Sequence, residues 1–253
     1  IEVRKGLAYG KDFNLEDLKK EGFQSVFLAI GAQNPKEISL EGSNVKGVIY
    51  GIPFLKQVNA DEPTAIGEKV VVIGGGNVAI DASRTALRLG SEVTIVYRRT
   101  REEMPAHYWE IEEAIDEGVS VMDSWSPLRI VSNQGSIQGL EVEKCYTVYN
   151  ENGKRSLKID SEQKIRVPAD TVILAIGQVC DLNDLDDLPA TERNLISTNR
   201  LTLETSYEGV FAGGDVVLGP SSLVDTVEQG HRAAESIDRY INGKDLGIDR
   251  SPV

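Results

Sequence analysis

Residues 70–79 read VVVIGGGNVA: an apolar run, three glycines and the start of a predicted helix. The spacing Gly74-x-Gly76-x-x-Ala79 is typical of dinucleotide-binding turns, with alanine in the last position. Gly74 permits a sharp turn out of a buried strand, and Gly76 has no side chain that would hold a pyrophosphate away. Ala79 is small enough for the helix to lie close to the strand. The helix N-terminus would then offer free N–H groups to phosphates.

The flanking residues complete a βαβ unit. Residues 70–73 predict a parallel strand buried on both faces, and residues 93–96 predict a second strand. Between them Gly90 is expected to cap the end of the helix. One apolar helix face is predicted from residues at helical spacing: Val78, Ala82, Ala86 and Leu89. Strand, glycine turn, helix and second strand together predict a nucleotide site.

The segment after the second strand bears on the choice of nucleotide. An NAD site usually has an acid there, but this segment has none and instead contains Arg98, Arg99 and Arg101. Guanidinium groups match a phosphate in charge and geometry, so the pattern favours NADP(H). Two alternatives remain: a solvated basic loop that balances Glu102 and Glu103, and a preference for NAD despite the arginines.

The composition is typical of a globular protein, with 40% apolar and 26% charged residues in 253. The net charge of −13 argues against a nucleic-acid partner. The absence of a long apolar run and of a signal peptide predicts a cytoplasmic protein with no membrane partner. Cys145 and Cys180 form no Cys-x-x-Cys pair and no metal set, so we expect two buried, inert thiols and no metal site.

Two further segments resemble each other. Residues 25–32 (SVFLAIGA) and 171–178 (TVILAIGQ) both predict a buried strand that ends in glycine. The second is expected to be the last strand of the nucleotide domain. The first implies an earlier domain of the same kind that lacks its own glycine turn. Between them, residues 119–122 predict a strand, and residues 128–168 predict a meander with turns at 133–135 and 152–153.

Near the end of the chain, residues 208–215 read EGVFAGGD and predict a short strand followed by Gly213, Gly214 and Asp215. Taken alone, Asp215 fits a helix or turn cap. Residues 222–242 predict a long helix, and Gly230 within it suggests close packing. The predicted apolar face of this helix is Leu223, Val227, Ala234, Ile237 and Ile241.

Taken in order, these segments resemble the two-dinucleotide flavoprotein reductases, most closely the glutamate synthase small subunit-like, NADPH-dependent FAD oxidoreductases. The matching segments are residues 27–32, 72–81, 96–106, 174–177 and 209–215. The resemblance implies an α/β fold in which a Rossmann-like NADPH domain is inserted in an FAD/NAD(P)-binding domain. The NADP(H) domain would be residues 62–178. Residues 1–61 and 179–253 would form an incomplete FAD domain.

The resemblance also implies roles for individual residues. The residues expected to contact the NADP pyrophosphate are Gly74, Gly76, Asn77 and Val78. Arg98 and Arg99, with Arg101 in the same loop, would hold the 2′-phosphate. The residues expected near FAD are Gly31, Gly214, Asp215, Ser222 and Leu223. Gly177, at the end of the last strand, completes the predicted cofactor-binding set, and no catalytic residue is nominated.

The implied activity is hydride transfer from NADPH to FAD, with electrons passing on to an iron–sulfur centre or a partner subunit. No general acid or base is required, so His107 and His231 are expected to be structural. The chain departs from the family because it has neither the iron–sulfur cysteines nor the FAD glycine turn. It is therefore expected to be a fragment or part of a split reductase. The alternative is a non-catalytic NADP(H)-binding module, colourless without the missing FAD half.

Overall fold

The computed structural model describes residues 1–149, 152–153, 155–183, 185, 190–191 and 194–250. The chain divides into two compact units. Unit 1 combines Ile1–Asn34 with Gln178–Val253, and unit 2 is Pro35–Gly177. Unit 2 is thus inserted in the sequence of unit 1.

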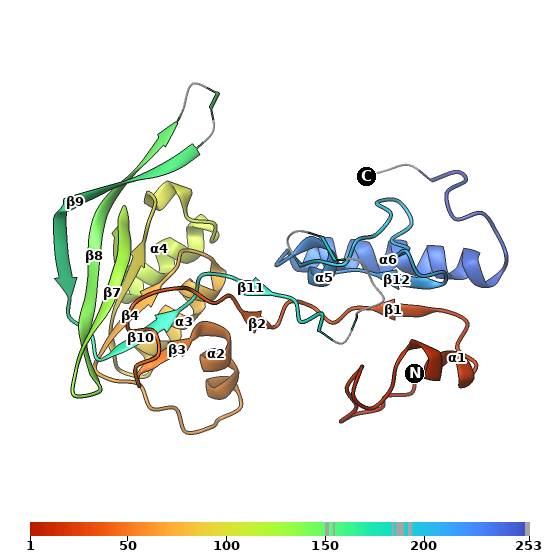
Figure 1. Cartoon of the computed structure of the whole chain (residues 1–253), viewed down its shortest axis with the longest axis horizontal. Coiled ribbons are helices and arrows are strands. Elements are labelled where there is room, and N and C mark those ends of the chain that lie inside the picture. The colour runs from red at the N-terminus through yellow and green to blue at the C-terminus, as the bar shows by residue number, and fades with distance from the viewer. Residues whose placement is uncertain (150–151, 154, 184, 186–189, 192–193, 251–253) are drawn as a thin grey trace. The chain divides into compact units, whose positions relative to one another are not determined.

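Unit 2 is built on a sheet of five parallel strands (Figure 1). In spatial order the strands are β3 (Val48–Tyr50), β10 (Thr171–Leu174), β4 (Lys69–Ile73), β5 (Glu92–Tyr97) and β6 (Ser120–Asp123). The predicted strands at residues 70–73, 93–96, 119–122 and 171–176 are confirmed within a few residues at their ends. Their apolar runs follow from burial on both faces of the sheet.

Helices cover one face of this sheet. They are α2 (Gly51–Asn59), α3 (Asn77–Arg88) and α4 (Tyr108–Glu117), and a 3₁₀ turn, η1 (Arg101–Glu103), precedes α4. Gly90, which has φ +99°, follows the C-terminal end of α3 and caps it as predicted. The Gly90 and Ser91 N–H groups bond the carbonyls of Leu87 and Ala86, a Schellman motif. Leu89 lies past the helix end and is half-exposed, so its place on the predicted apolar face was wrong.

An antiparallel sheet covers the other face. It consists of β7 (Trp125–Asn133), β8 (Ser136–Tyr149) and β9 (Arg155–Val167), the green arrows of Figure 1. The predicted meander is confirmed. Gln134 and Gly135 have φ values of +49° and +80°. Positive φ at both central residues is what the two-residue type I′ turn of a tight hairpin requires. Both residues of the second predicted turn are described: Asn152 lies in a turn and Gly153 has φ +70°.

Unit 1 has shorter elements. They are α1 (Leu15–Lys20), β1 (Val26–Leu28), β2 (Asn34–Pro35, at the boundary), β11 (Gln178–Val179), β12 (Val210–Ala212), α5 (Asp215–Leu218) and α6 (Leu223–Ile241). Strands β1 and β12 pair in parallel, and β2 and β11 form a separate two-stranded sheet. Leu28, Val210 and Val216 lie in an apolar core of this unit.

Helix α6 forms as predicted, but the predicted buried face was wrong. Leu223 and Val227 are 78% and 51% exposed, whereas Gln229, Ala233 and Ser236 are buried. Polar residues occupy the packed face because they have partners: the Gln229 amide oxygen accepts from the Gly214 N–H, and the Ser236 hydroxyl donates to the Arg232 carbonyl. A Cβ at Gly230 would meet nothing within 4 Å, so the predicted close packing there is also wrong.

The compact units begin at different residues from the predicted domains. The predicted boundary at residues 61/62 falls after β3 and α2, whereas the observed boundary falls at Asn34/Pro35. The difference arises because β3 pairs with β10 and Phe54 of α2 is buried in the core of unit 2. The cofactor bound by each unit stays a prediction. Among the residues described, no helix is long and apolar enough to cross a membrane.

Candidate functional site

The glycine elbow, Gly74–Gly76, joins the carboxyl end of β4 to α3. Strand β4 lies between β10 and β5, so the elbow occupies the point where the strand order reverses, the usual ligand site of such sheets. Gly74 has φ +147°, and a Cβ there would lie 2.1 Å from the Ala175 carbonyl oxygen. Ala79, with no exposed surface, packs against the same glycine. Gly74 and Ala79 therefore have the packing roles that the spacing predicts.

The other two elbow glycines differ in what surrounds them. A Cβ at Gly75 would lie 2.5 Å from the Tyr97 ring, so packing requires glycine there. Gly76 has φ −93° and ψ 177°, a conformation open to any residue. A Cβ at Gly76 would meet only Pro105 Cγ, at 3.8 Å. Nothing within the described fold requires glycine at position 76, which is consistent with a ligand that approaches the backbone closely.

The elbow and the first turn of α3 present hydrogen-bond donors. Within the described part of the chain, the backbone N–H groups of Gly75, Gly76, Asn77 and Val78 donate to no other group. The first turn of α3 has no acidic residue, so no side-chain carboxylate of that turn competes for these donors. A helix N-terminus carries partial positive charge, and these donors suit a phosphate.

The arginine loop, Arg98–Arg101, follows β5, the neighbouring strand. The Cys145 thiol donates to the Arg98 carbonyl at 2.9 Å, and the Ser124 N–H donates to the Arg99 carbonyl at 2.8 Å. Among the described residues, the Arg98 and Arg99 guanidinium groups form no ion pair, whereas Arg101 pairs with Glu112. Two of the three predicted arginines thus keep their charge available for an anion.

Two of the predicted FAD residues, Gly214 and Asp215, lie in unit 1 in the acidic turn, Gly213–Asp215, between β12 and α5. Gly214 has φ +74°, and its N–H donates to the Gln229 amide oxygen at 2.6 Å. The Asp215 Oδ1 accepts from both the N–H and the hydroxyl of Ser221, at 3.1 and 2.9 Å. Asp215 therefore fixes the loop that leads to α6.

The remaining predicted residues lie at the start of α6 and in the segments that follow β1 and β10. Ser222 caps α6 by accepting from the Asp225 N–H, and Leu223 beside it is 78% exposed. Gly31 and Gly177 both have positive φ, and a Cβ at either would meet nothing within 4 Å. Gly177 belongs to unit 2 and Gly31 to unit 1.

Both histidines are exposed and both cysteines are buried, and the structural role expected of the histidines stays a prediction. The His107 ring stacks on Trp109, with ring centroids 4.5 Å apart, at the start of α4. Exposed His231 lines a surface pocket of about 650 Å³ beside Arg232 and Arg250. Cys145 and Cys180 are buried as predicted, and burial raises the pKa of both thiols, which keeps them protonated.

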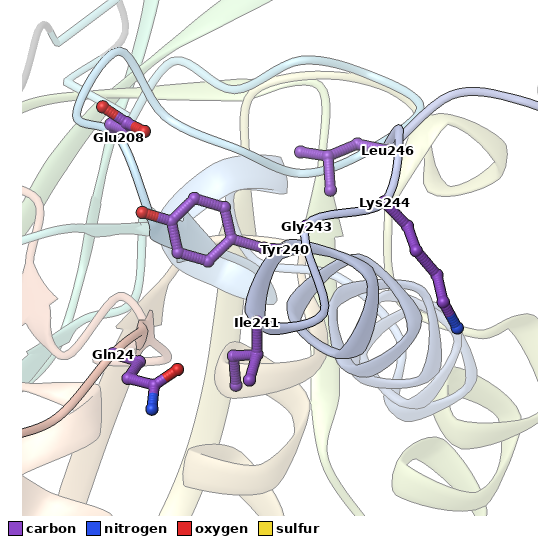
Figure 2. A pocket seen from close by; sticks show the side chains of 7 residues that line it. All are labelled: Gln24, Glu208, Tyr240, Ile241, Gly243, Lys244 and Leu246. Carbon is purple, nitrogen blue, oxygen red and sulfur yellow. The ribbon is translucent and has the colours of Figure 1, made fainter.

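A second surface pocket, of about 620 Å³, lies at the C-terminal end of α6 (Figure 2). The side chains of Glu208, Tyr240 and Leu246 border it, with Ile241 below. Tyr240 packs directly on Gly209, which has φ +75°. No predicted cofactor residue lines this pocket or the one beside His231, so both are separate from the elbow and the acidic turn.

Sequence reasoning assigned no role to the residues that hold the elbow and the arginine loop. The Ala106 N–H donates to the Gly75 carbonyl at 3.1 Å, and the Tyr97 hydroxyl donates to the Glu103 carbonyl at 2.8 Å. One signal was readable: Thr100-x-x-Glu103 is a capping-box pattern, and the structure forms that box. The bonds from Cys145 of β8 to Arg98 and from Ser124, just before β7, to Arg99 had no local signal in the sequence.

Comparisons with known proteins agree on one family. The model of the pyridine nucleotide-disulphide oxidoreductases matches residues 4–235. The NADP(+)-dependent formate dehydrogenase subunit beta of Moorella thermoacetica is 40% identical, over 95% of this chain and 35% of that protein. The NADPH-Fe(3+) oxidoreductase subunit beta of Geobacter sulfurreducens is 38% identical, over 92% and 39%. The glutamate synthase [NADPH] small chain of Escherichia coli is 32% identical, over 95% and 55%.

The chain thus spans about a third to just over half of the length of these relatives. Among solved structures, FprA of Mycobacterium tuberculosis in complex with NADPH superposes with a TM-score of 0.79 at 16% identity, over 97% of this chain and 69% of that one. Thioredoxin reductase of T. acidophilum gives 0.65 at 21%, over 87% and 66%. These likenesses confirm the predicted fold class, and the sequence matches confirm the resemblance to the glutamate synthase small subunit family.

Proposed function

Because the chain belongs to the pyridine nucleotide-disulphide oxidoreductase family, we propose that it forms the NADP(H)- and FAD-binding part of an NADPH-dependent oxidoreductase. The observation that carries this proposal is the elbow. Within the described residues, packing does not require glycine at position 76, and the N–H groups of Gly75 to Val78 donate to no other group. The names of two relatives support the same coenzyme, since the formate dehydrogenase subunit beta and the glutamate synthase small chain are both named for NADP(H).

Unit 2 would hold NADP(H). The N–H groups of Gly75 to Val78 would bond the pyrophosphate, and the side-chain-free face of Gly76 would let it approach. Arg98 and Arg99 would hold the 2′-phosphate, because a guanidinium group binds phosphate oxygens through two parallel hydrogen bonds. Arg101 would act less directly, since it already pairs with Glu112.

Unit 1 would hold FAD at the acidic turn. Asp215 Oδ1 is engaged by Ser221, and the carboxylate still offers acceptor capacity for hydroxyl groups of the ribityl chain. Ser222 and Leu223, at the start of α6, would lie near the flavin, and Gly31 would pass close to the cofactor. When bound, FAD supplies the acceptor, flavin N5, for the hydride that leaves nicotinamide C4. The residues described here bind and orient; none is needed as an acid or base.

We also propose that electrons leave for a partner subunit or an iron–sulfur centre. The relatives named subunit beta or small chain support a partner, because those names describe components of larger assemblies. A cytoplasmic location fits two unpaired, buried cysteines.

The proposal is tested by the visible spectrum of the chain after incubation with FAD and removal of free flavin. We expect flavin absorption bands that bleach on anaerobic addition of NADPH and persist, or bleach more slowly, with NADH. A protein with flavin bands that NADPH leaves unchanged would contradict the proposed activity.

The same experiment separates the second candidate, a non-catalytic NADP(H)-binding module. The short strands of unit 1 favour this candidate, since β1 and β12 pair over three residues each. It predicts a colourless protein that still binds NADPH. NADPH affinity measured by calorimetry, beside the spectrum, decides between the two.

A further inference from the structure

Glu103 connects the arginine loop to the distal half of the β8–β9 hairpin. Its Oε2 accepts from the Thr100 N–H at 3.3 Å and from the Thr147 hydroxyl at 2.8 Å. Its Oε1 accepts from Arg155 at 2.9 Å. Thr147 lies on β8 and Arg155 on β9, so one carboxylate joins the arginine loop to residues 44 and 52 positions later, on both strands of the hairpin.

The backbone of Glu103 is hydrogen-bonded as well. Its carbonyl accepts from the hydroxyl of Tyr97, the residue whose ring packs against Gly75 of the elbow. Glu103 is therefore joined to the last residue of β5 before the loop, to Thr100 within the loop and to the hairpin beyond it. Together with the Cys145 and Ser124 bonds, these contacts fix the backbone from which Arg98 and Arg99 project.

The charge of Glu103 would oppose an anion unless it were matched. The Thr147 hydroxyl and, to a smaller degree, Arg155 lower the pKa of this carboxyl, so it is ionised at neutral pH. The Glu103 side chain is only 19% exposed. Arg155 balances its charge on the hairpin side, so Glu103 forms its ion pair there and, among the described residues, none with Arg98 or Arg99.

We propose that Glu103 is the positioning residue of the 2′-phosphate site, and that through it the β8–β9 hairpin takes part in coenzyme selection. The inference rests on the proposed function, which places the 2′-phosphate at Arg98 and Arg99. Glu103 does not touch the coenzyme. It sets the loop geometry in which two guanidinium groups converge on one phosphate, and a phosphate contact depends steeply on such geometry.

The test compares the affinities of the whole chain for NADPH and NADH by fluorescence titration. Glu103→Ala is expected to lower the NADPH preference about tenfold, the effect of losing bonds to a charged group, while NADH affinity changes little. Thr147→Val removes one of these bonds from the hairpin side and should lower the preference about threefold. Glu103→Gln keeps an acceptor for Thr147 and should fall between Glu103→Ala and the unmodified chain.

Glu102→Ala is the matched control, because Glu102 is an exposed glutamate of the same η1 turn and, among the described contacts, does not reach the hairpin. Removing a negative charge beside the arginines should leave the NADPH preference equal or higher. Loss of charge at Glu103 would by itself act in that same direction. A lower preference in Glu103→Ala therefore reports loop geometry and not charge.

The outcomes separate the two proposals. An unmodified chain without NADPH preference overturns both the proposed NADP(H) site and this inference. If that preference exists, an unchanged ratio in Glu103→Ala, or equal loss for both coenzymes, overturns the inference alone. Thermal unfolding of each variant shows whether it folds. If Glu103→Ala does not fold, an unchanged ratio in Thr147→Val overturns the inference.

Discussion

Two glycine turns in this chain follow a parallel strand and lead into a helix, but they offer opposite chemistry. The elbow between β4 and α3 presents N–H donors and no acid in the first helical turn. The acidic turn between β12 and α5 uses the N–H of Gly214 internally, in a bond to Gln229, and places the Asp215 carboxylate at its helix start.

The difference shows how one kind of backbone turn can serve two parts of a nucleotide. A donor surface next to a helix N-terminus attracts phosphate, whereas a carboxylate repels phosphate and accepts hydrogen bonds from hydroxyl groups. The elbow therefore suits a pyrophosphate, and the acidic turn suits the sugar-like part of a dinucleotide. The predictions below test this division, starting with the largest expected effect.

The first prediction concerns Gly76→Val at the elbow. The valine side chain would project where only Pro105 Cγ lies near, so it would meet the ligand before it met the protein. We expect NADPH affinity to fall about 100-fold, as geometric displacement at a binding site commonly costs, with little change in melting temperature. Calorimetry and thermal unfolding measure both quantities.

Gly74→Ala is the control, because its Cβ would lie 2.1 Å from the Ala175 carbonyl oxygen. It should destabilise the fold by about 2 kcal/mol, the cost typical of overpacking. If Gly76→Val destabilised the protein as much as Gly74→Ala, position 76 would be glycine for packing and the assignment of the elbow to a ligand would fail.

The second prediction concerns Arg98→Ala in the arginine loop. Affinity for 2′,5′-ADP should fall about tenfold, since a hydrogen bond between charged groups is lost, while affinity for 5′-ADP should stay unchanged. Arg101→Ala should have a smaller effect, because Arg101 pairs with Glu112. Equal loss of affinity for the two nucleotides would show that Arg98 does not recognise the 2′-phosphate.

The third prediction concerns Asp215→Asn in the acidic turn. The amide keeps one acceptor for Ser221 but loses the charge, so FAD affinity should fall about fivefold, as expected when a charge-assisted bond becomes neutral. NADPH affinity should not change. Equilibrium dialysis with FAD measures the first quantity and calorimetry the second. An FAD affinity equal to that of the unmodified chain would remove Asp215 from the cofactor site.

The fourth prediction has the smallest expected effect. It concerns the ion pairs between α3, the helix that follows the elbow, and α4. Arg84 of α3, assisted by Arg88, lowers the pKa of Glu117 on α4 from 4.5 to about 2. A carboxyl whose pKa is lower in the folded state contributes stability above its unfolded pKa and loses that contribution as pH falls. The difference in free energy of unfolding between the unmodified chain and Glu117→Gln, here called the stability gap, should therefore be constant above pH 4.5 and shrink toward pH 2.

Chemical unfolding over this pH range gives the gap. Glu62→Gln serves as the control, because Glu62 is exposed and forms no ion pair among the described residues. A gap for Glu117→Gln that stayed constant down to pH 2 would contradict the assigned pKa.

Local patterns were sufficient to predict the elbow and its sheet. Gly74, Ala79 and the strands at residues 70–73 and 93–96 are specified by near neighbours and by burial on both faces, which sequence periodicity reports directly. The arginine loop was predictable for the same reason. The order of β3 and β10 in the sheet was not, because β3 pairs with a strand more than a hundred residues later.

Features that depend on distant partners could not be predicted. The buried face of α6 contains Gln229 and Ser236, which are accommodated because Gly214 and Arg250 supply their hydrogen-bond partners. Periodicity counts apolar residues and therefore selected the exposed side, with Leu223 and Val227. Glu103 is similar: its capping box is local, but its contacts with Thr147 and Arg155 depend on how the hairpin lies over the loop.

The insertion of unit 2 within unit 1 has a consequence for biosynthesis. Ser25 donates to the Gly209 carbonyl across 184 residues, and β1 has no other strand to pair with among those described until β12 is made. All strands of unit 2 leave the ribosome before β12, with a delay on the order of ten seconds at roughly 5–20 residues per second. During that interval the nascent β1 segment would expose Val26 and Leu28 without their later neighbours in the core of unit 1, which makes it a target for chaperones.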